Sequence, residues 1–331
     1  MGFLARRLAV KLLLVFVAAS LAYLLASIAL DPAKVYLDAG REVPREAILA
    51  ALDRYNVNPD VPLLQRYATW LAGVARGDFG LVFQTGDPVS EVLLRRMGVS
   101  LRLLLVGTVL AVVLGVVIGV LGAARQYRVD DHVTTIVAFV LLSTPVFLLA
   151  NFLKFGGDWV NATSGTVLVY FDGEYHTGPD AGLVERAQHL LLPTLALVLG
   201  PAGVAFFSRY QRSAMLDVLG SEFITTARAK GLTKRRAFFA HGLRVALIPM
   251  ATFFAFTFGL LITGATFVEK VFNWNGMGQW AVDSIKNSDV NAIAAITLVV
   301  AVLVMISGML ADIIHAFLDP RVRTTQRGAR A

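Results

Sequence analysis

Side chains that could perform chemistry are few and widely spaced in this sequence. Metal coordination and nucleophilic catalysis draw heavily on Cys and His, and the chain has no Cys and only five His. No two of the histidines stand at a spacing typical of metal ligands: they are His132, His176, His189, His241 and His315. The sequence therefore predicts no metal site and no cofactor held by this chain.

Motifs for phosphate binding and acyl transfer are missing as well. No Gly-x-x-x-x-Gly-Lys-Ser/Thr loop occurs, so the chain is not expected to bind nucleotide phosphates by that device. The Gly-x-Ser-x-Gly and His-Glu-x-x-His patterns do not occur either. We therefore expect a chain that is not an enzyme.

The composition indicates a membrane protein. Of the 331 residues, 56% are hydrophobic and 16% are charged, whereas soluble domains carry about 25% charged residues. A helix that crosses a bilayer core needs roughly 20 apolar residues, and six stretches are suitable: about Leu8–Leu30, Leu103–Ala124, Val133–Leu153, Leu190–Phe207, Ala246–Val268 and Ala292–Ala316. The sequence thus predicts an all-α polytopic membrane protein with six transmembrane helices.

Charged residues inside these spans are Lys11 and Asp312, each close to a span end. A carrier coupled to protons or sodium normally keeps a carboxylate near the middle of the bilayer. No span offers one, so coupling to an ion gradient is not expected. If the chain moves a solute uphill, the energy must come from another polypeptide.

The distribution of Lys and Arg predicts the orientation. Basic residues gather near the N-terminus, in residues 208–245 and in the tail 321–331, and the remaining segments carry more acidic than basic residues. The positive-inside rule places both termini and residues 208–245 in the cytoplasm. The net charge of +7 is thus an inside charge and implies no nucleic-acid partner. A cleaved signal peptide is the alternative for residues 1–30, although their uncharged run is longer than a signal peptide requires.

The predicted division of the chain follows from these spans. Residues 1–30 form the N-terminal tail and first span, 31–100 an external helical segment, 101–320 a five-helix transmembrane domain and 321–331 a cytoplasmic tail. Residues 155–187 are the external loop of the five-helix domain. Pro44–Tyr55 and Pro62–Arg76 are expected to be short amphipathic helices, and Asp87-Pro88 is expected to start a third. Asp172-Gly173, within Thr166–Thr177, predicts a β-hairpin.

The largest cytoplasmic loop, residues 208–245, is expected to form a bent helical element. Ser221 is a suitable cap for a helix that has Glu222 in its first turn. Gly231 is a natural end for this helix, and Thr233 can cap a second helix. Small residues at the bend allow close approach of a partner. The neighbouring basic residues Lys234, Arg235 and Arg236 could instead contact anionic lipid.

The same loop resembles a known family. Thr226-Ala227-Arg228-Ala229-Lys230-Gly231-Leu232, followed by His241-Gly242-Leu243-Arg244 and Ala246-Leu247-Ile248-Pro249, is similar to the EAA motif of dipeptide/oligopeptide ABC importer permeases. Four further matches follow the family's order along the chain: Gly77–Gly80 with Asp87–Val89, Ser143–Phe147, Glu269–Phe272 with Gly276–Gly278, and Leu318–Arg321. They favour the first permease of the peptide pair. The Glu-Ala-Ala triplet itself is replaced by Thr225-Thr226-Ala227.

This resemblance implies an assembly with several partners. In such importers the loop forms a coupling helix that sits in a cleft of an ATPase. The implied partners are a second homologous permease, two ATPase subunits or domains that bind ATP and magnesium, an extracellular substrate-binding protein, a peptide substrate and membrane lipid. The residues expected to couple to the ATPase are Thr225, Thr226, Ala227, Arg228, Ala229, Lys230, Gly231 and Leu232. A permease for nickel or another small solute is one alternative, and a channel or secondary carrier without ATPases is another.

Candidates for the substrate pathway are hydroxyl and aromatic residues in otherwise aliphatic spans. A peptide pathway should be broad, weakly polar and tolerant of sequence. Pro145, which follows Thr144, is expected to kink the third span rather than to touch substrate, and such a kink frees carbonyls that can face a cavity. The candidates are Ser143, Thr144, Phe147, Thr252, Phe256 and Thr263.

Overall fold

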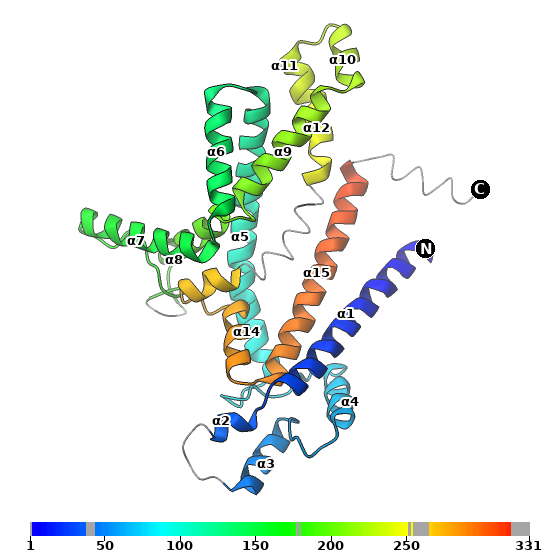
Figure 1. Cartoon of the computed structure of the whole chain (residues 1–331), viewed down its shortest axis with the longest axis vertical. Helices are drawn as coiled ribbons and strands as arrows, with labels where there is room; N and C mark the ends of the chain where they lie inside the picture. Colours follow the sequence, from blue (N-terminus) through cyan, green and yellow to red (C-terminus); the bar gives the residue numbers. More distant parts are fainter. Residues whose placement is uncertain are drawn as a thin grey trace. The chain divides into compact units, whose positions relative to one another are not determined.

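A computed structural model of the chain describes residues 2–37, 44–176, 178, 180–250, 253 and 265–318. Regular structure in these ranges is helical, with one isolated antiparallel bridge between Leu81 and Pro88, so the expected all-α fold is confirmed (Figure 1). The chain divides into two compact units. Unit 1 comprises Met1–Leu101 and Asn275–Met305, and unit 2 comprises Arg102–Trp274 and Ile306–Ala331.

Unit 1 contains short helices packed on the first apolar helix. Its core joins Tyr23, Leu52 and Trp70, and the rings of Tyr23 and Trp70 stack at 4.7 Å. Two of the helices confirm the amphipathic helices expected between the first two spans. The helices are α1 (Gly2–Ala29), α2 (Ala33–Leu37), α3 (Arg45–Arg54), α4 (Leu63–Val74) and α14 (Met277–Lys286), with the first parts of α5 (Val89–Ala124) and α15 (Val290–Leu318).

The start of α15 is tied to distant parts of unit 1 by two polar side chains. The buried carboxylate of Asp289 accepts hydrogen bonds from the backbone N–H groups of Phe83 at 2.8 Å and of Ala292 at 3.0 Å. The amide of Asn291 donates to the carbonyl of Tyr55 at 2.9 Å. Because Phe83 and Tyr55 lie more than 200 residues earlier in the chain, the start of α15 fixes the loop that precedes α5.

Unit 2 contains the remaining helices. A core of buried apolar residues joins the end of α5 to α9 and to the segment that follows α11. The helices are the later part of α5, α6 (Val129–Ser143), α7 (Val146–Ser164), α8 (Leu183–Leu199), α9 (Val204–Leu219), α10 (Glu222–Ala229), α11 (Lys234–Ala237), the π-helix η1 (Phe238–Gly242), α12 (Leu243–Ala246) and the end of α15.

Glycines on α5 let α9 approach its backbone. A Cβ atom added at Gly119 would lie 2.4 Å from the carbonyl oxygen of Ser208, and one at Gly115 would lie 2.5 Å from Cβ of Phe207. Small residues of this kind are typical of helix contacts in membranes, where van der Waals packing drives association. The α5–α9 contact therefore depends on glycine at both positions.

The structure corrects the boundaries expected around the second span. The helix that starts after Asp87-Pro88 is not a separate third helix but the beginning of α5. This helix has 36 residues, a length of about 54 Å at 1.5 Å per residue, against a bilayer core of about 30 Å. Nothing between Val89 and Ala124 supplies a stop: the stretch has no Pro, and its glycines remain helical.

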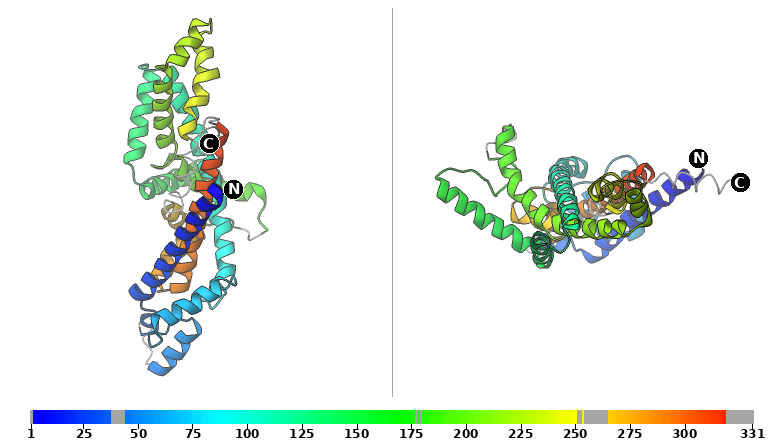
Figure 2. Two further views of the ribbon diagram at one scale, coloured as in Figure 1. Left: turned by 90° about the vertical axis from the view of Figure 1, so that its right-hand side faces the viewer. Right: turned by 90° about the horizontal axis from the view of Figure 1, so that it is seen from above.

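The predicted third and fourth spans are both broken helix pairs. The break between α6 and α7 bends the chain by 108°, and α7 runs away from α6 in Figures 1 and 2. Thr144 is extended, with φ −88° and ψ 120°, because a residue before Pro avoids the helical region. The link between α8 and α9, which contains Pro201, bends the chain by 43°, whereas Pro193 lies inside α8 without ending it.

The hairpin expected at Asp172-Gly173 does not form in the described residues 166–176, which contain no strand. The turn itself is present, since Gly173 has φ +72°. Backbone groups on either side find other partners. The side chain of Asn161 bonds the N–H of Leu168 at 2.9 Å and the carbonyl of Val169 at 2.8 Å, and Gly173 donates to the carbonyl of Phe272 at 2.9 Å.

Helices that could cross a membrane number three in the described ranges, or up to five if each broken pair counts as one span. The single helices are Leu8–Ala29, Val89–Ala124 and Val290–Ile313. The predicted fifth span, Ala246–Val268, falls largely outside the described residues. The count of six therefore stays a prediction.

Candidate functional site

The bend between α10 and α11, which we call the elbow (residues 222–237), is the site that the sequence singled out. Figure 1 shows it at one end of unit 2, beyond α9 and α12. Helix α10 begins at Glu222 as expected, after an extended Ser221. The Ser221 hydroxyl does not cap the helix, however, but donates to the carbonyl of Val218 at 2.5 Å. It therefore joins α10 to the end of α9.

Gly231 ends α10 in the expected way. The N–H of Gly231 donates to the carbonyl of Arg228 at 3.0 Å, and the N–H of Leu232 donates to that of Ala227 at 3.3 Å. This pair of bonds is the Schellman arrangement, which needs a left-handed residue after the helix. Gly231 has φ +93°, where a side chain would be strained. The direction of the chain after α10 thus depends on this glycine.

The second arm of the elbow is capped and anchored. The Thr233 hydroxyl accepts a hydrogen bond from the N–H of Arg236 at 3.3 Å, as the sequence predicted. The arm continues through the π-helix into α12, and Phe238 packs in a core with Met215 of α9 and Val120 of α5. Displacement of this arm would therefore disturb the packing between α9 and α5.

One face of the elbow is buried and the other is open. Ile224 is 3% exposed and packs near Gly242. Of the residues expected to couple to an ATPase, Ala227 and Leu232 are half-buried, and six are exposed: Thr225, Thr226, Arg228, Ala229, Lys230 and Gly231. The Thr226 hydroxyl is used within α10, where it donates to the carbonyl of Glu222 at 2.9 Å. The elbow is thus an exposed surface on a fixed base.

A buried ion pair that the sequence did not reveal joins α6 to α9. Nε and Nη2 of Arg212 donate to the two carboxylate oxygens of Asp131 at 2.6 and 2.8 Å. The Asp131 side chain is 2% exposed, and the one of Arg212 is 29% exposed. The N–H of Tyr127 also donates to Asp131, at 3.0 Å. The partners are 81 residues apart, so no local spacing could have indicated the pair.

Three of the six residues expected along the substrate pathway, Ser143, Thr144 and Phe147, are among the described residues. The hydroxyls of Ser143 and Thr144 donate to the carbonyls of Phe139 and Val140, each at 2.8 Å. Such bonds satisfy carbonyls near a helix break, so Pro145 breaks the span and these hydroxyls support the break. Phe147 is 48% exposed. Thr252, Phe256 and Thr263 lie outside the described residues.

Lys154 of α7 is a further polar residue that the sequence did not single out. Its Nζ donates to the carbonyl of Val271 at 3.0 Å and to the carboxylate of Asp172 at 3.3 Å. It therefore links α7 to two segments that lie far apart in the chain. Lys154 lies between the predicted third span and the predicted external loop 155–187. Lysines at such positions are ordinarily solvated, so the sequence gave no reason to single it out.

Metal coordination finds no support in the described ranges, where no group of three or more His, Cys, Asp or Glu could hold an ion. The same ranges contain apolar helices of membrane-spanning length and an exposed, anchored elbow. Together these features define a multi-pass helical membrane protein.

The family follows from comparison with known proteins. Residues 111–324 match the family described as the binding-protein-dependent transport system inner membrane component, and the chain belongs to this family. The match includes α6 to α9, the elbow and all of α15.

Relatives with similar sequences cover most of the chain. The oligopeptide transport system permease protein OppB of Mycobacterium tuberculosis is 50% identical over 98% of this chain and 99% of its own length. The oligopeptide transport system permease protein AppB of Bacillus subtilis is 37% identical over 82% of this chain and 83% of its own length. The dipeptide transport system permease protein DppB of Escherichia coli is 31% identical over 80% and 82%.

Proposed function

We propose that this chain is the transmembrane permease subunit of an ATP-binding-cassette importer of oligopeptides or dipeptides. The family and the three relatives, named as peptide permeases, support this function. They favour peptides over nickel or another small solute, and a subunit of a larger transport system over a channel or carrier that acts alone. As a permease, the chain is not catalytic itself.

The mechanism we infer is alternating access driven by partner proteins. Two ATPase subunits or domains bind ATP and magnesium, close on each other and move the elbow. A second homologous permease completes the pathway, and an extracellular binding protein delivers the peptide. The observation that carries this mechanism is the elbow itself, whose outer face is exposed and whose base is packed on α9 and α5.

The membrane arrangement belongs to the same proposal. The chain lies in the bacterial cytoplasmic membrane with both termini and the elbow in the cytoplasm. The first span and the external segment 31–100 precede the five-helix domain 101–320, which contains the external loop 155–187 and the cytoplasmic loop 208–245; the tail is 321–331. Basic residues of the elbow, such as Arg228 and Lys230, fit the positive-inside rule.

Coupling through the elbow can be tested with a matched pair of substitutions. Thr226→Arg places a long cation on the exposed face of α10, and Thr69→Arg does the same on α4 of unit 1. Both threonines are exposed, and both hydroxyls donate to the carbonyl four residues earlier. We expect Thr226→Arg to abolish peptide uptake and to reduce peptide-stimulated ATP hydrolysis in the reconstituted importer at least about tenfold, since a misplaced interface charge costs several kcal/mol.

Thr69→Arg should leave uptake and ATP hydrolysis near the wild-type values. Thermal denaturation of both variants checks that neither has lost its fold. Normal ATP hydrolysis in a folded Thr226→Arg complex would contradict the docking role. Peptide accumulation by vesicles that contain this chain alone would contradict the proposed function as a whole.

A further inference from the structure

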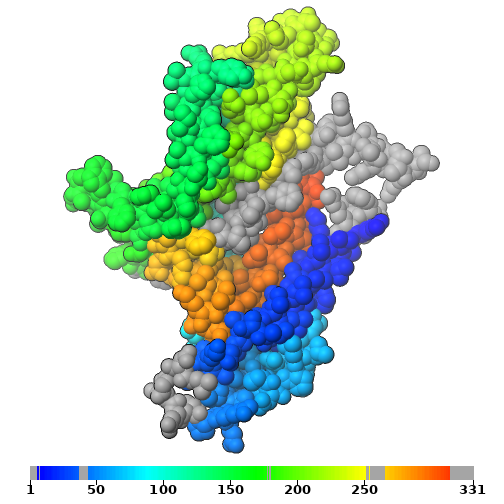
Figure 3. Space-filling view, viewed as in Figure 1, coloured from blue at the N-terminus to red at the C-terminus, as the bar shows by residue number. Residues whose placement is uncertain are grey.

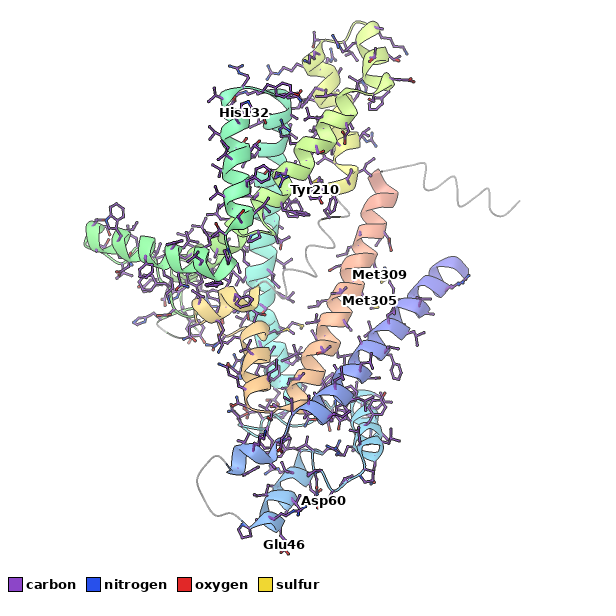
Figure 4. All side chains as sticks on the ribbon, viewed as in Figure 1. Glu46, Asp60, His132, Tyr210, Met305 and Met309 are labelled. Carbon is purple, nitrogen blue, oxygen red and sulfur yellow. The ribbon has the colours of Figure 1, made fainter. Side chains whose placement is uncertain are left out.

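A groove between α6 and α9 has a polar character that the proposed function leaves unexplained. Thr134, Thr135, Ser208, Arg209 and Arg212 line it, together with small and apolar residues. Figure 3 shows the surfaces of α6 and α9 side by side in unit 2. In Figure 4, His132 marks the end of α6 next to Asp131, and Tyr210 marks α9 next to Arg209. The groove therefore lies near the end of α6 that the charge pattern places in the cytoplasm.

Two arginines supply the free hydrogen-bond donors of this groove. The hydroxyls of Thr135 and Ser208 donate to carbonyls of their own helices, so they offer lone pairs only. Arg212 uses Nε and Nη2 on Asp131, and its Nη1 has no acceptor among the described residues.

Arg209 is exposed and stands 4.2 Å from the ring centroid of Phe139 on α6. Stacking on an aromatic ring orients the planar guanidinium while leaving its N–H edge available. No carboxylate pairs with Arg209 in the part of the chain that the structure describes. The groove thus presents N–H groups of two guanidinium side chains, and no carboxylate among the described residues compensates the charge of Arg209.

An apolar surface begins beside the groove at Phe139, which is 50% exposed and lies under the guanidinium of Arg209. Ile136, Val140 and Val133, each more than 50% exposed, continue from Phe139 around the outer face of α6. A free inorganic anion would make no use of this surface. An acyl chain would cover it, because burial of apolar area is favourable.

We propose that the α6–α9 groove binds the phosphodiester headgroup of an anionic phospholipid, with Arg209 and Arg212 on the phosphate and the acyl chains on the exposed face of α6. Guanidinium groups bind phosphate through paired N–H bonds. Basic pockets between membrane helices on the cytoplasmic side are suited to such lipids. The inference goes beyond the proposed function, since it does not depend on what the importer carries.

Titration with phosphatidylglycerol tests the site. The detergent-solubilised full-length chain is mixed with increasing phosphatidylglycerol, and bound lipid is counted by native mass spectrometry. Arg209→Gln removes the charge and keeps a polar side chain of similar length, and we expect it to weaken binding about tenfold, the loss of one charge-assisted contact. Arg209→Lys keeps the charge but loses the paired N–H groups of the guanidinium, and it should weaken binding less than Arg209→Gln.

Arg128→Gln is the matched control, because Arg128 is an exposed arginine next to α6 that does not line the groove. It should change the affinity by less than about twofold. Equal losses in Arg128→Gln and Arg209→Gln, or none in Arg209→Gln, would overturn the site. Displacement of the lipid by millimolar inorganic phosphate would identify a free-anion site instead, and equal binding of phosphatidylcholine would rule out selection of anionic lipid.

Discussion

At the scale of single residues, the two partners of the Asp131–Arg212 ion pair differ in burial. The carboxylate is almost fully buried, whereas the guanidinium is partly exposed. Three N–H groups from Arg212 and Tyr127 compensate the charge of Asp131. Removal of the charge therefore leaves Arg212 partly buried without its partner.

The substitution Asp131→Asn is expected to lower the stability of unit 2. Loss of one partner of a buried ion pair costs about 3–5 kcal/mol, and the partial exposure of Arg212 favours the lower value. A fall in the midpoint of thermal denaturation, measured on the chain in detergent, would show this. Asp130→Asn is the control, because the Asp130–Arg125 pair is 43% and 58% exposed and such surface pairs contribute about 0–1 kcal/mol. Equal midpoints for the two variants would contradict the prediction.

At the scale of elements, α5 holds unit 2 together through its contact with α9. The added Cβ at Gly119 would meet backbone oxygen of Ser208 and backbone nitrogen of Arg212, neither of which can move without shifting α9. Gly98 lies on the same helix, and a Cβ atom there would meet nothing within 4 Å. Helix α5 therefore contains one glycine at which a Cβ atom would clash and one at which it would not.

Gly119→Ala is expected to destabilise the chain by about 1–3 kcal/mol, the range for overpacking. Gly98→Ala should stabilise it by about 0.5–1 kcal/mol, because alanine favours helix where space is free. Denaturation curves of the two variants in one detergent would measure both effects. If Gly119→Ala proved as stable as Gly98→Ala, the α5–α9 contact would not be as close as described.

Elements were predictable where local rules decide them. Short-range patterns located α3, α4, the start of α10, its end at Gly231 and the cap at Thr233, because each depends on residues within one or two turns. The 108° break at Thr144 and the missing hairpin were not predictable in the same way. Pro145 indicated a kink, but its angle depends on packing, and the backbone of residues 168–173 is bonded by Asn161 and by the distant Phe272.

In the candidate site, too, local patterns were predictable and contacts between distant residues were not. The sequence located the elbow, whereas the ion pair and the lysine contacts elsewhere in unit 2 came only from the structure. Asp131 and Arg212 are 81 residues apart, and Lys154 reaches Val271 across 117 residues. A single sequence contains no signal for contacts at such separations.

At the scale of the whole molecule, the lack of cysteine makes the proposed orientation measurable. Any cysteine introduced is the only thiol in the chain. Asp60 lies in unit 1 with its side chain 55% exposed, and Lys230 is exposed at the elbow. The proposal places these two positions on opposite sides of the membrane.

Asp60→Cys is expected to react with a membrane-impermeant maleimide in spheroplasts, and Lys230→Cys only after the membrane is permeabilised. The measurement is the labelled fraction of each variant with and without permeabilisation. The original chain is the control and should not label at all. Labelling of both positions in unpermeabilised spheroplasts would contradict the proposed topology.

The bonds at the start of α15 limit how such chains can be recombined. Asp289 and Asn291 bond the backbone of Phe83, Leu81 and Tyr55, so the two stretches form one structural piece although the chain visits them at widely separated points. A chimera that takes only residues 31–100 from a donor permease would pair foreign loops with resident side chains. A successful graft must therefore transfer the segment around residues 275–292 together with the earlier one.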